Sequence, residues 1–243
     1  MTRLIVNADD MGFSLGVNAG VIEAYKRGIV TSCSIMATMP GFEDAIEKLK
    51  DNKGLGTGVH LTLSSYEPLL KGHKTIVDKN GKFYKYVTEE IAKNFDEEEI
   101  LKEFTAQIEK VLSSGIKITH FDSHHHVHQL PQLKGVMQKL VDKYKLPIRG
   151  GINYKLENAV VIPVLDSFYK EGVSIDYFKK NIDKFKELGT SDLMTHPAWV
   201  DDVLLNSTSY AIDRIKEYEV LTSEKVLKIL KENNIELISY GEL

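Results

Sequence analysis

Short apolar runs alternate along the chain with longer segments in which apolar residues recur at helical spacing. The apolar runs predict strands over 4–7, 30–36, 57–63, 118–123, 147–152, 192–195 and 236–239. Most of these runs are apolar on both faces, which is typical of parallel strands covered by helices. The periodic segments between them predict helices over 14–27, 42–50, 87–112, 133–144, 175–188 and 223–233.

This alternation predicts an α/β protein built from βα units. About seven or eight such units fit a (β/α) barrel, and an open doubly wound sheet is the alternative with the same alternation. No internal repeat and no Pro/Gly-rich linker interrupts the pattern, so we expect a single domain over 1–243. The least regular part is Ser64–Lys85, which is either an ordinary long loop or a lid over the strand ends.

The composition is that of a globular protein, with 42% hydrophobic and 27% charged residues in a chain of 243. The single cysteine, Cys33, excludes an intramolecular disulfide and a cysteine-based zinc site. A net charge of −4 does not favour a nucleic-acid partner.

No apolar run reaches the roughly 18 residues of a membrane span, so we expect a cytoplasmic protein with no membrane association. A homodimer would be ordinary for a protein of this size.

Polar clusters lie at the carboxyl ends of four predicted strands. Asp9 and Asp10 follow the first apolar run, His60 lies in the third, and His196 follows the sixth. Five of the eight histidines lie between positions 120 and 128, in the sequence THFDSHHHVH. Because the carboxyl ends of strands in barrels and open α/β sheets meet on one face, we expect these clusters to form one site.

Each cluster also has a purely structural interpretation. The two aspartates resemble a helix N-cap followed by a turn, and His60 could be a hydrogen-bonded histidine inside a buried strand. The histidine tract could be a solvated loop that binds metal only adventitiously. Arg149 is either a surface charge or a partner that keeps a catalytic carboxylate ionised.

The local backbone decides whether neighbouring side chains reach the same site. Adjacent strand residues point in opposite directions, so Asp9 and Asp10 serve together only if the strand ends there and the chain turns, which Gly12 permits. In the histidine tract, strand alternation puts positions 120, 122, 124, 126 and 128 on one face and His125 on the other. One or two of these side chains would then be ligands, and the others would support them or contact the substrate. Pro197 holds His196 in an extended conformation.

One aspartate and two histidines, without cysteine, suit Zn, Mn, Co, Ni or Fe(II). Three protein ligands leave positions open for water and substrate, which is the arrangement of catalytic sites. These parts suffice for metal-assisted hydrolysis of an amide or ester, although the same ligand set serves Fe(II) oxygenases. The sequence has no G-x-S-x-G, no P-loop and no G-x-G-x-x-G motif, so serine-nucleophile and nucleotide-binding functions have no support.

Five blocks of the sequence together resemble the YdjC-like carbohydrate deacetylases, which include chitooligosaccharide deacetylases. The blocks begin with LIVNADDMGFSLGVNAGVIEAYKRGIVTSCSIM and continue with GVHLTL, THFDSHHHVHQLPQL, MTHPAWVDD and RIKEYEVLTS. The resemblance runs from Leu4 to Tyr240. It implies a deformed (β/α) barrel related to the polysaccharide deacetylases. It also implies divalent-metal-dependent removal of acetyl groups from N-acetylated sugars.

The resemblance implies roles for individual residues. Asp10, His60 and His124 would bind one divalent metal, with Mg or Zn as the first candidates and Mn, Co or Ni as others. Asp9 would be the general base, His196 the general acid, and Arg149 the residue that orients the base. The residues expected to contact a small carbohydrate substrate are Asp122, His126, His128, Trp199 and Tyr66, the last two by stacking on sugar faces.

Two features depart from the family pattern. Met11 stands where relatives usually have phenylalanine, an apolar exchange that should leave the chemistry intact. The segment Ser64–Lys85 matches no motif of the family, which leaves the identity of the sugar open, because loops over a barrel mouth set specificity.

Three other functions remain compatible with the residues. One is a different metal hydrolase, either another amidase or a phosphoesterase, although a phosphatase would need a second metal and more bridging carboxylates. The second is an Fe(II) oxygenase, which should contain iron and consume oxygen. The third is a metal- or sugar-binding protein without turnover.

Overall fold

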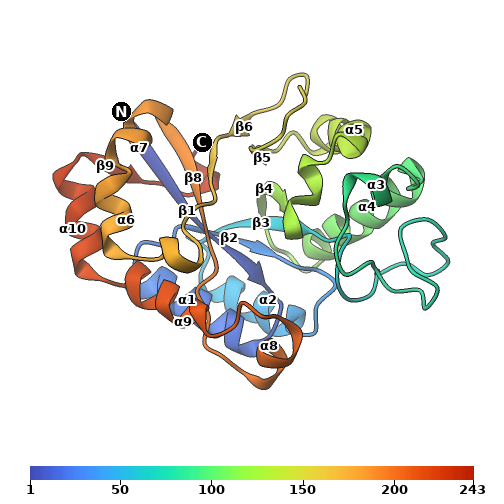
Figure 1. Cartoon of the computed structure of the whole chain (residues 1–243), viewed down its shortest axis with the longest axis horizontal. Coiled ribbons are helices and arrows are strands. Elements are labelled where there is room, and N and C mark those ends of the chain that lie inside the picture. The colour runs from blue at the N-terminus through green and yellow to red at the C-terminus, as the bar shows by residue number, and fades with distance from the viewer.

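The computed structural model describes all 243 residues, folded around one sheet of nine parallel strands (Figure 1). Eight strands follow the order β6-β5-β4-β3-β2-β1-β8-β7, and β9 pairs with the start of β1. The strands are β1 (Thr2–Met11), β2 (Ser32–Ile35), β3 (Gly56–Leu61), β4 (Ile118–Ser123), β5 (Ile148–Arg149), β6 (Val161–Ile162), β7 (Val164–Leu165), β8 (Thr190–Thr195) and β9 (Ile235–Leu237).

A single bent segment nearly closes the sheet into a barrel. Its first half, β6, pairs with β5, and its second half, β7, pairs with β8. Pro163 lies between the halves and cannot donate a hydrogen bond, but its carbonyl accepts one from the Asp192 amide at 2.8 Å. The two ends of the strand order are therefore neighbours in the chain. The fold is the predicted deformed (β/α) barrel and not the open sheet.

Helices flank the barrel on the left, below and on the right in Figure 1, and the loop that leads into β6 lies at the top. They are α1 (Leu15–Arg27), α2 (Phe42–Asp51), α3 (Glu89–Ala92), α4 (Glu97–Ser113), α5 (Lys134–Tyr144), α6 (Ile175–Lys180), α7 (Ile182–Leu188), α8 (Asp202–Ser207), α9 (Asp213–Leu221) and α10 (Glu224–Glu232). The cap of α1 is the predicted one, because the Ser14 hydroxyl accepts a hydrogen bond from the Val17 amide at 3.2 Å.

Two predicted helices are each divided in the structure. The segment 87–112 breaks into α3 and α4 because Asp96 is an N-cap, its carboxylate accepting from the amides of Glu98 and Glu99. The segment 175–188 breaks into α6 and α7 at Asn181, whose side chain donates to the Tyr177 carbonyl. Strands β6 and β7 and helices α8 and α9 were not predicted.

The strand boundaries also differ from the prediction, most at two places. The first strand continues to Met11, beyond the predicted end at Asn7. The predicted strand 147–152 shrinks to Ile148–Arg149, because Gly151 has a φ of +84° that ends the extended backbone. Strand β4 occupies Ile118–Ser123, as predicted.

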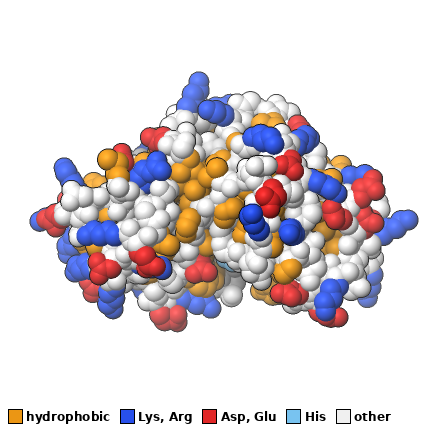
Figure 2. Space-filling view, turned by 90° about the horizontal axis from the view of Figure 1, so that it is seen from above, with side chains coloured by type: hydrophobic (Ala, Val, Ile, Leu, Met, Phe, Trp, Pro, Cys, Tyr) orange, Lys and Arg blue, Asp and Glu red, His pale blue; other side chains and the backbone are white.

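The central strands are buried on both faces, as their apolar composition predicts, whereas β6, β7 and β9 are partly exposed. Every residue of β2 and β3 is buried, and so is every residue of β1 from Leu4 to Met11. One large apolar cluster joins the barrel interior to the surrounding helices. Basic and acidic side chains are interspersed over the face shown in Figure 2. None of the helices combines the length and the apolar character that crossing a membrane requires.

Candidate active site

A cavity of about 320 Å³ opens at the carboxyl ends of the strands. Mostly polar side chains line it, and they come from β1, β3, β4 and the chain that follows β8. The lining residues are Asp9, Asp10, His60, Ser123, His124, His125, His126, Asp166, Tyr169, Met194, His196, Thr208, Tyr210 and Arg214. All residues assigned above as metal ligands, base or acid border this cavity.

An irregularity in β1 brings the two adjacent aspartates into the same cavity. The strand does not end before them; its register against β2 shifts between Ala8 and Met11. Asp10 itself adopts a left-handed conformation, with φ +67°, which aspartate tolerates better than most residues. The predicted turn is therefore centred on Asp10, and Gly12, with φ +91°, continues it.

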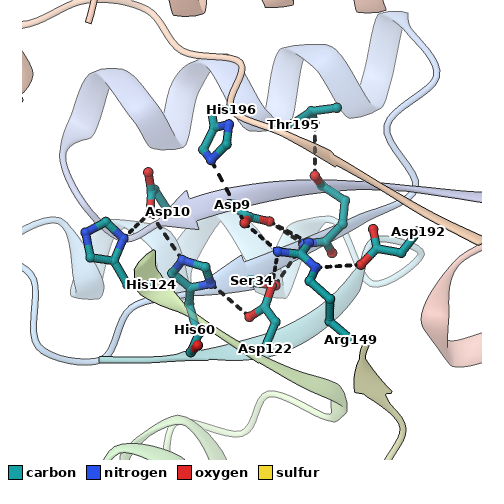
Figure 3. Close-up of polar contacts among 12 residues, drawn as sticks. Asp9, Asp10, Ser34, His60, Asp122, His124, Arg149, Asp192, Thr195 and His196 are labelled. Carbon is teal, nitrogen blue, oxygen red and sulfur yellow. Dashed lines mark hydrogen bonds and ion pairs between the residues drawn. The ribbon is translucent and has the colours of Figure 1, made fainter. Parts of the chain in front are cut away.

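The donor atoms of Asp10, His60 and His124 converge. One carboxylate oxygen of Asp10, Oδ1, lies 3.4 Å from His60 Nε2 and 3.1 Å from His124 Nδ1 (Figure 3). The other oxygen, Oδ2, accepts a hydrogen bond from Arg214 Nη2 at 2.7 Å. One donor atom from each of the three residues lies within 4.8 Å of the other two, so the group is suited to hold one metal ion.

Asp122 fixes the orientation of the His60 ring. Its Oδ1 lies 2.8 Å from His60 Nδ1, so Nδ1–H donates to the carboxylate and Nε2 faces Asp10, where it can bind a metal once its own proton is lost. This is the arrangement in which a carboxylate supports a metal-binding histidine. Burial of His60 opposes its charged form and so lowers its pKa. The negative charge of Asp122 and the hydrogen bonds of His60 to Asp10 and Asp122 outweigh this effect and raise the pKa of His60 to about 10. Asp122 is completely buried beneath His60 and does not border the cavity.

The charge of the cluster also suits a cation. The buried side chains include four aspartates and only two arginines: Asp9, Asp10, Asp122 and Asp192 against Arg149 and Arg214. Buried charges require compensation, and a divalent cation beside Asp10 would supply it. A second possible donor group, formed by Asp9, His60 and Asp122, is less suited because Arg149 already contacts both of its carboxylates.

Arg149 holds Asp9 by two hydrogen bonds. Its Nη1 lies 2.6 Å from Asp9 Oδ2, and its Nη2 lies 2.8 Å from Asp9 Oδ1. Burial opposes ionisation of Asp9, but the adjacent Arg149 guanidinium lowers the pKa of that carboxyl. Arg149 Nε donates to Asp192 Oδ2 at 2.7 Å, and the Tyr240 hydroxyl donates to the same oxygen at 2.7 Å. Arg149 is thus fully buried, which excludes the surface-charge interpretation.

His196 lies on the other side of Asp9. Its Nε2 is 4.0 Å from Asp9 Oδ2, across the cavity from His60 (Figure 3). Glu217 holds it from behind: the His196 amide donates to Oε2 at 2.5 Å, and His196 Nδ1 lies 3.6 Å from Oε1. The Tyr210 hydroxyl donates to Glu217 Oε1 at 2.5 Å. The ring is therefore oriented with Nε2 toward the cavity.

The histidine tract does not continue as a strand. After Ser123 the chain forms a 3₁₀ segment, His124–Gln129, in which His125 and His126 have φ of 52° and 55°. The prediction that alternation separates His125 from its neighbours is therefore wrong, and His124, His125 and His126 all border the cavity. His128 is instead fully buried, with Nδ1 2.5 Å from the Ser123 hydroxyl, and it does not border the cavity.

Two aromatic residues expected to contact the sugar lie elsewhere. Trp199 packs against Tyr218, with ring centroids 4.8 Å apart, outside the cavity. Tyr66 packs edge-to-face on Phe13 at 6.0 Å and faces a separate hollow beside Met39. Local packing in loops sets the positions of both rings, and the residue type alone does not predict that packing. Of the five residues expected to contact the substrate, the structure brings only His126 to the cavity.

Several residues that line or support the cavity could not be assigned a role from the sequence. Arg214 and Glu217 come from α9, and Tyr169, Tyr210 and Asp166 come from the irregular chain around β8. The only signal for the first two is the block RIKEYEVLTS, which contains both. Ser34 also supports the site, because its hydroxyl donates to Asp122 Oδ2 at 2.7 Å.

The fold and the site together define a (β/α)-barrel protein with a candidate metal centre at the carboxyl ends of its strands. This chain belongs to the YdjC-like protein family, whose sequence profile matches residues 3–232.

Relatives that are named carbohydrate deacetylases support this membership. The chain is 42% identical to carbohydrate deacetylase 1 of Listeria innocua, over 99% of this chain and 100% of that protein. It is 39% identical to a carbohydrate deacetylase of Clostridium beijerinckii, with the same coverage.

Solved structures agree on the fold. A crystal structure from Enterococcus faecalis, described as that of a candidate cellobiose-phosphate cleavage protein, is 33% identical, has a TM-score of 0.92, and matches 99% of this chain and 98% of that one. A family 4 carbohydrate esterase from Streptomyces lividans, solved with acetate, has a TM-score of 0.55 at 10% identity, with coverage of 98% and 91%. The second likeness concerns the fold alone.

Proposed function

We propose that this chain is a divalent-metal-dependent hydrolase that removes acetyl groups from N-acetylated sugars. The observation that carries the proposal is the convergence of Asp10 Oδ1, His60 Nε2 and His124 Nδ1 beside a carboxylate, Asp9, which Arg149 keeps ionised. The relatives named carbohydrate deacetylases support the same activity.

Asp10, His60 and His124 would hold the metal. Two imidazoles and one carboxylate favour Zn, Mn, Co or Ni over Mg, which prefers oxygen ligands. When bound there, the cation lowers the pKa of water and acts as a Lewis acid toward a carbonyl oxygen. Arg214 donates to Oδ2 of Asp10, so Oδ1 is the oxygen that would bind the metal.

Asp9 is the proposed general base. The Arg149 guanidinium keeps it ionised near neutral pH. Oδ2 retains a lone pair for the water beyond its bond to Arg149, whereas Oδ1 also accepts a hydrogen bond from Asn7 Nδ2 at 2.8 Å. As the water oxygen bonds to the acetyl carbon, Asp9 accepts the proton from the water. Arg149 holds the carboxylate in place, which keeps the base oriented toward the reacting water.

His196 is the proposed general acid. Its Nε2 lies 4.0 Å from Asp9, so base and acid face the same small region of the cavity. When the C–N bond breaks, His196 donates a proton to the departing sugar nitrogen. The products are acetate and a sugar with a free amine. A cavity of about 320 Å³ is at the small end of ligand sites, which suits a sugar.

The direct test combines elemental analysis of the purified protein with an acetate-release assay on N-acetylated mono- and oligosaccharides. His60→Ala and His124→Ala should each lose both bound metal and hydrolysis. Asp9→Asn should retain the metal and lose about 10²–10⁴-fold in kcat, the usual contribution of a general base. Full activity of Asp9→Asn would refute the assignment of the base.

The same preparations separate this proposal from its alternatives. An oxygenase would contain iron and consume oxygen. A phosphoesterase would hydrolyse p-nitrophenyl phosphate without releasing acetate from sugars. A binding protein would retain metal and sugar but release no acetate.

A further inference from the structure

The two oxygens of the Asp10 carboxylate have different partners. Oδ1 lies 3.4 Å from His60 Nε2 and 3.1 Å from His124 Nδ1 (Figure 3). Oδ2 instead accepts a hydrogen bond from Arg214 Nη2 at 2.7 Å, and both of these side chains are buried. A short bond between two charged groups is among the stronger hydrogen bonds in proteins. The two oxygens are therefore not equally available to a metal ion.

Arg214 is held in place by contacts other than its bond to Asp10. Its Nε donates to the Tyr210 carbonyl at 2.8 Å, and the guanidinium lies 5.8 Å from the centre of the Tyr210 ring. The Tyr210 hydroxyl in turn donates to Glu217, which belongs to α9, as Arg214 does. Because the guanidinium is fixed on both sides, it stays on Oδ2 while Oδ1 faces the two imidazoles.

The position of this arginine opposes metal binding in two ways. A guanidinium beside a ligand carboxylate repels a divalent cation at the same carboxylate, and the repulsion is strong where water is excluded. The guanidinium also occupies one of the two oxygens, although a free carboxylate can bind one cation through both. Arg214 should therefore lower the affinity of the site for a cation, compared with the same site without it.

The advantage of the arrangement lies in the positions that it leaves open. Metal-assisted hydrolysis needs room on the cation for a water molecule and for the oxygen of the acetyl group. Three protein atoms leave this room, whereas a second oxygen from Asp10 would occupy one of the positions. The nearby carboxylate of Asp9 is similarly restrained, because Arg149 donates to both of its oxygens.

We propose that Arg214 is a positioning residue that limits Asp10 to a single metal-binding oxygen, which lowers the metal affinity and keeps positions on the cation open for reactants. The inference rests on the proposed function in one respect, since it takes Asp10, His60 and His124 as the ligands. It predicts that removing Arg214 tightens metal binding. Removing a partner that only orients a ligand would instead weaken metal binding about 10–100-fold.

Calorimetric titration of the metal-free protein with zinc tests the sign of this effect. Arg214→Met removes the charge and the donor but keeps a side chain of similar length, so its zinc affinity should rise about tenfold or more. Arg214→Lys keeps a cationic donor and should lie closer to wild type. Arg27→Met is the matched control at an exposed arginine and should not change the affinity. An unchanged or weaker zinc affinity in Arg214→Met would overturn the proposal.

Two small anions then probe the open positions of the zinc-loaded proteins. Acetohydroxamate chelates a metal through two oxygens and needs two open positions, whereas azide needs one. The lost charge of Arg214 affects both anions alike, so only the number of open positions distinguishes them. Arg214→Met should therefore lose affinity for acetohydroxamate while azide binding changes little in comparison. Equal changes for the two anions would mean that Arg214 acts through its charge alone, and the proposal would fail.

The wild type alone decides the question if Arg214→Met does not fold. A crystal structure of the zinc-loaded wild type should show zinc on Oδ1 of Asp10 and Arg214 still on Oδ2, and zinc bound to both oxygens would refute the inference. None of these measurements needs turnover. The expected zinc and anion results without acetate release would refute the deacetylase and leave the role of Arg214 supported. Acetate release with unchanged zinc affinity in Arg214→Met would refute only the role of Arg214.

Discussion

Replacing Arg149 by methionine removes the one cation that three buried carboxylates share. Arg149 lies 2.6 Å from Asp9, 2.9 Å from Asp122 and 2.7 Å from Asp192, and all four side chains are buried. Methionine has a similar length and no charge, so the packing is largely kept while the charge compensation is lost. The variant therefore isolates the electrostatic contribution of the guanidinium.

The expected destabilisation is large. Breaking a buried ion pair by removing one partner costs about 3–5 kcal/mol, because a charge stays buried without compensation. For a chain of this size, each kcal/mol lowers Tm by about 2–4 °C, so Tm should fall by roughly 6–20 °C. Arg27→Met is the matched control, because Arg27 is exposed and its 3.7 Å ion pair with Glu23 should contribute less than about 1 kcal/mol.

The loss of stability in Arg149→Met should increase as the pH rises. In the native protein, burial opposes ionisation of Asp9 and Asp122, but Arg149 together with His60 lowers the pKa of both carboxyls. Their contribution to stability is therefore present above the unfolded pKa, near 4, and is lost as the pH falls through the folded value. Without Arg149, burial and the repulsion from Asp122 should raise the pKa of Asp9 above its unfolded value, so the variant is penalised increasingly as the pH rises.

The assay is urea unfolding of the metal-free protein, in chelator, at about pH 5 and about pH 7.5. The difference in the free energy of unfolding between wild type and Arg149→Met should be smaller at the lower pH, and contributions of unrelated histidines cancel in that difference. A difference that is equal at both pH values, or below about 1 kcal/mol, would refute the assignment of Arg149 as the shared counter-charge.

Three further changes test separate parts of the site. Asp122→Asn keeps the shape under His60 but weakens its carboxylate partner, so zinc affinity measured by calorimetry should fall about 10–100-fold; an unchanged affinity would contradict the role of Asp122. Tyr240→Phe removes the hydroxyl bonded to Asp192 and should lower the free energy of unfolding by about 1–3 kcal/mol, whereas no change would mean that the bond contributes nothing. Gly20→Ala puts a methyl group 2.4 Å from the Ala198 backbone just after His196, so overpacking should cost about 1–3 kcal/mol; a variant as stable as wild type would show that α1 can move there.

The barrel could be predicted from the sequence where its strands are apolar on both faces. Strands β3, β4 and β8 lie close to the predicted ranges, because each carries buried apolar residues, such as Val59 and Leu61 in β3, although buried polar side chains interrupt all three. Strands β6 and β7 could not be predicted, since two-residue strands are too short to carry a pattern. Helix α9 has no clear apolar stripe because its buried face includes Arg214 and Glu217.

The same reasons limit the prediction of the site. Asp9, Asp10, His60 and His196 could be recognised because each lies at the carboxyl end of an apolar run. The positions of His125 and His126 could not, because the left-handed backbone there has neither glycine nor proline to signal it. Arg214, which lines the cavity, and Glu217, which supports His196, come from a helix far along the chain. Only the tertiary structure brings them to Asp10 and His196.

The last residues of the chain complete the support of the proposed base. Strand β9 pairs with the start of β1, and Tyr240 just beyond it bonds to Asp192, the partner of Arg149. The orientation of the proposed base therefore depends on contacts between distant parts of the sequence. A substitution that loosens the pairing of β9 should disturb the cavity without touching any residue that lines it.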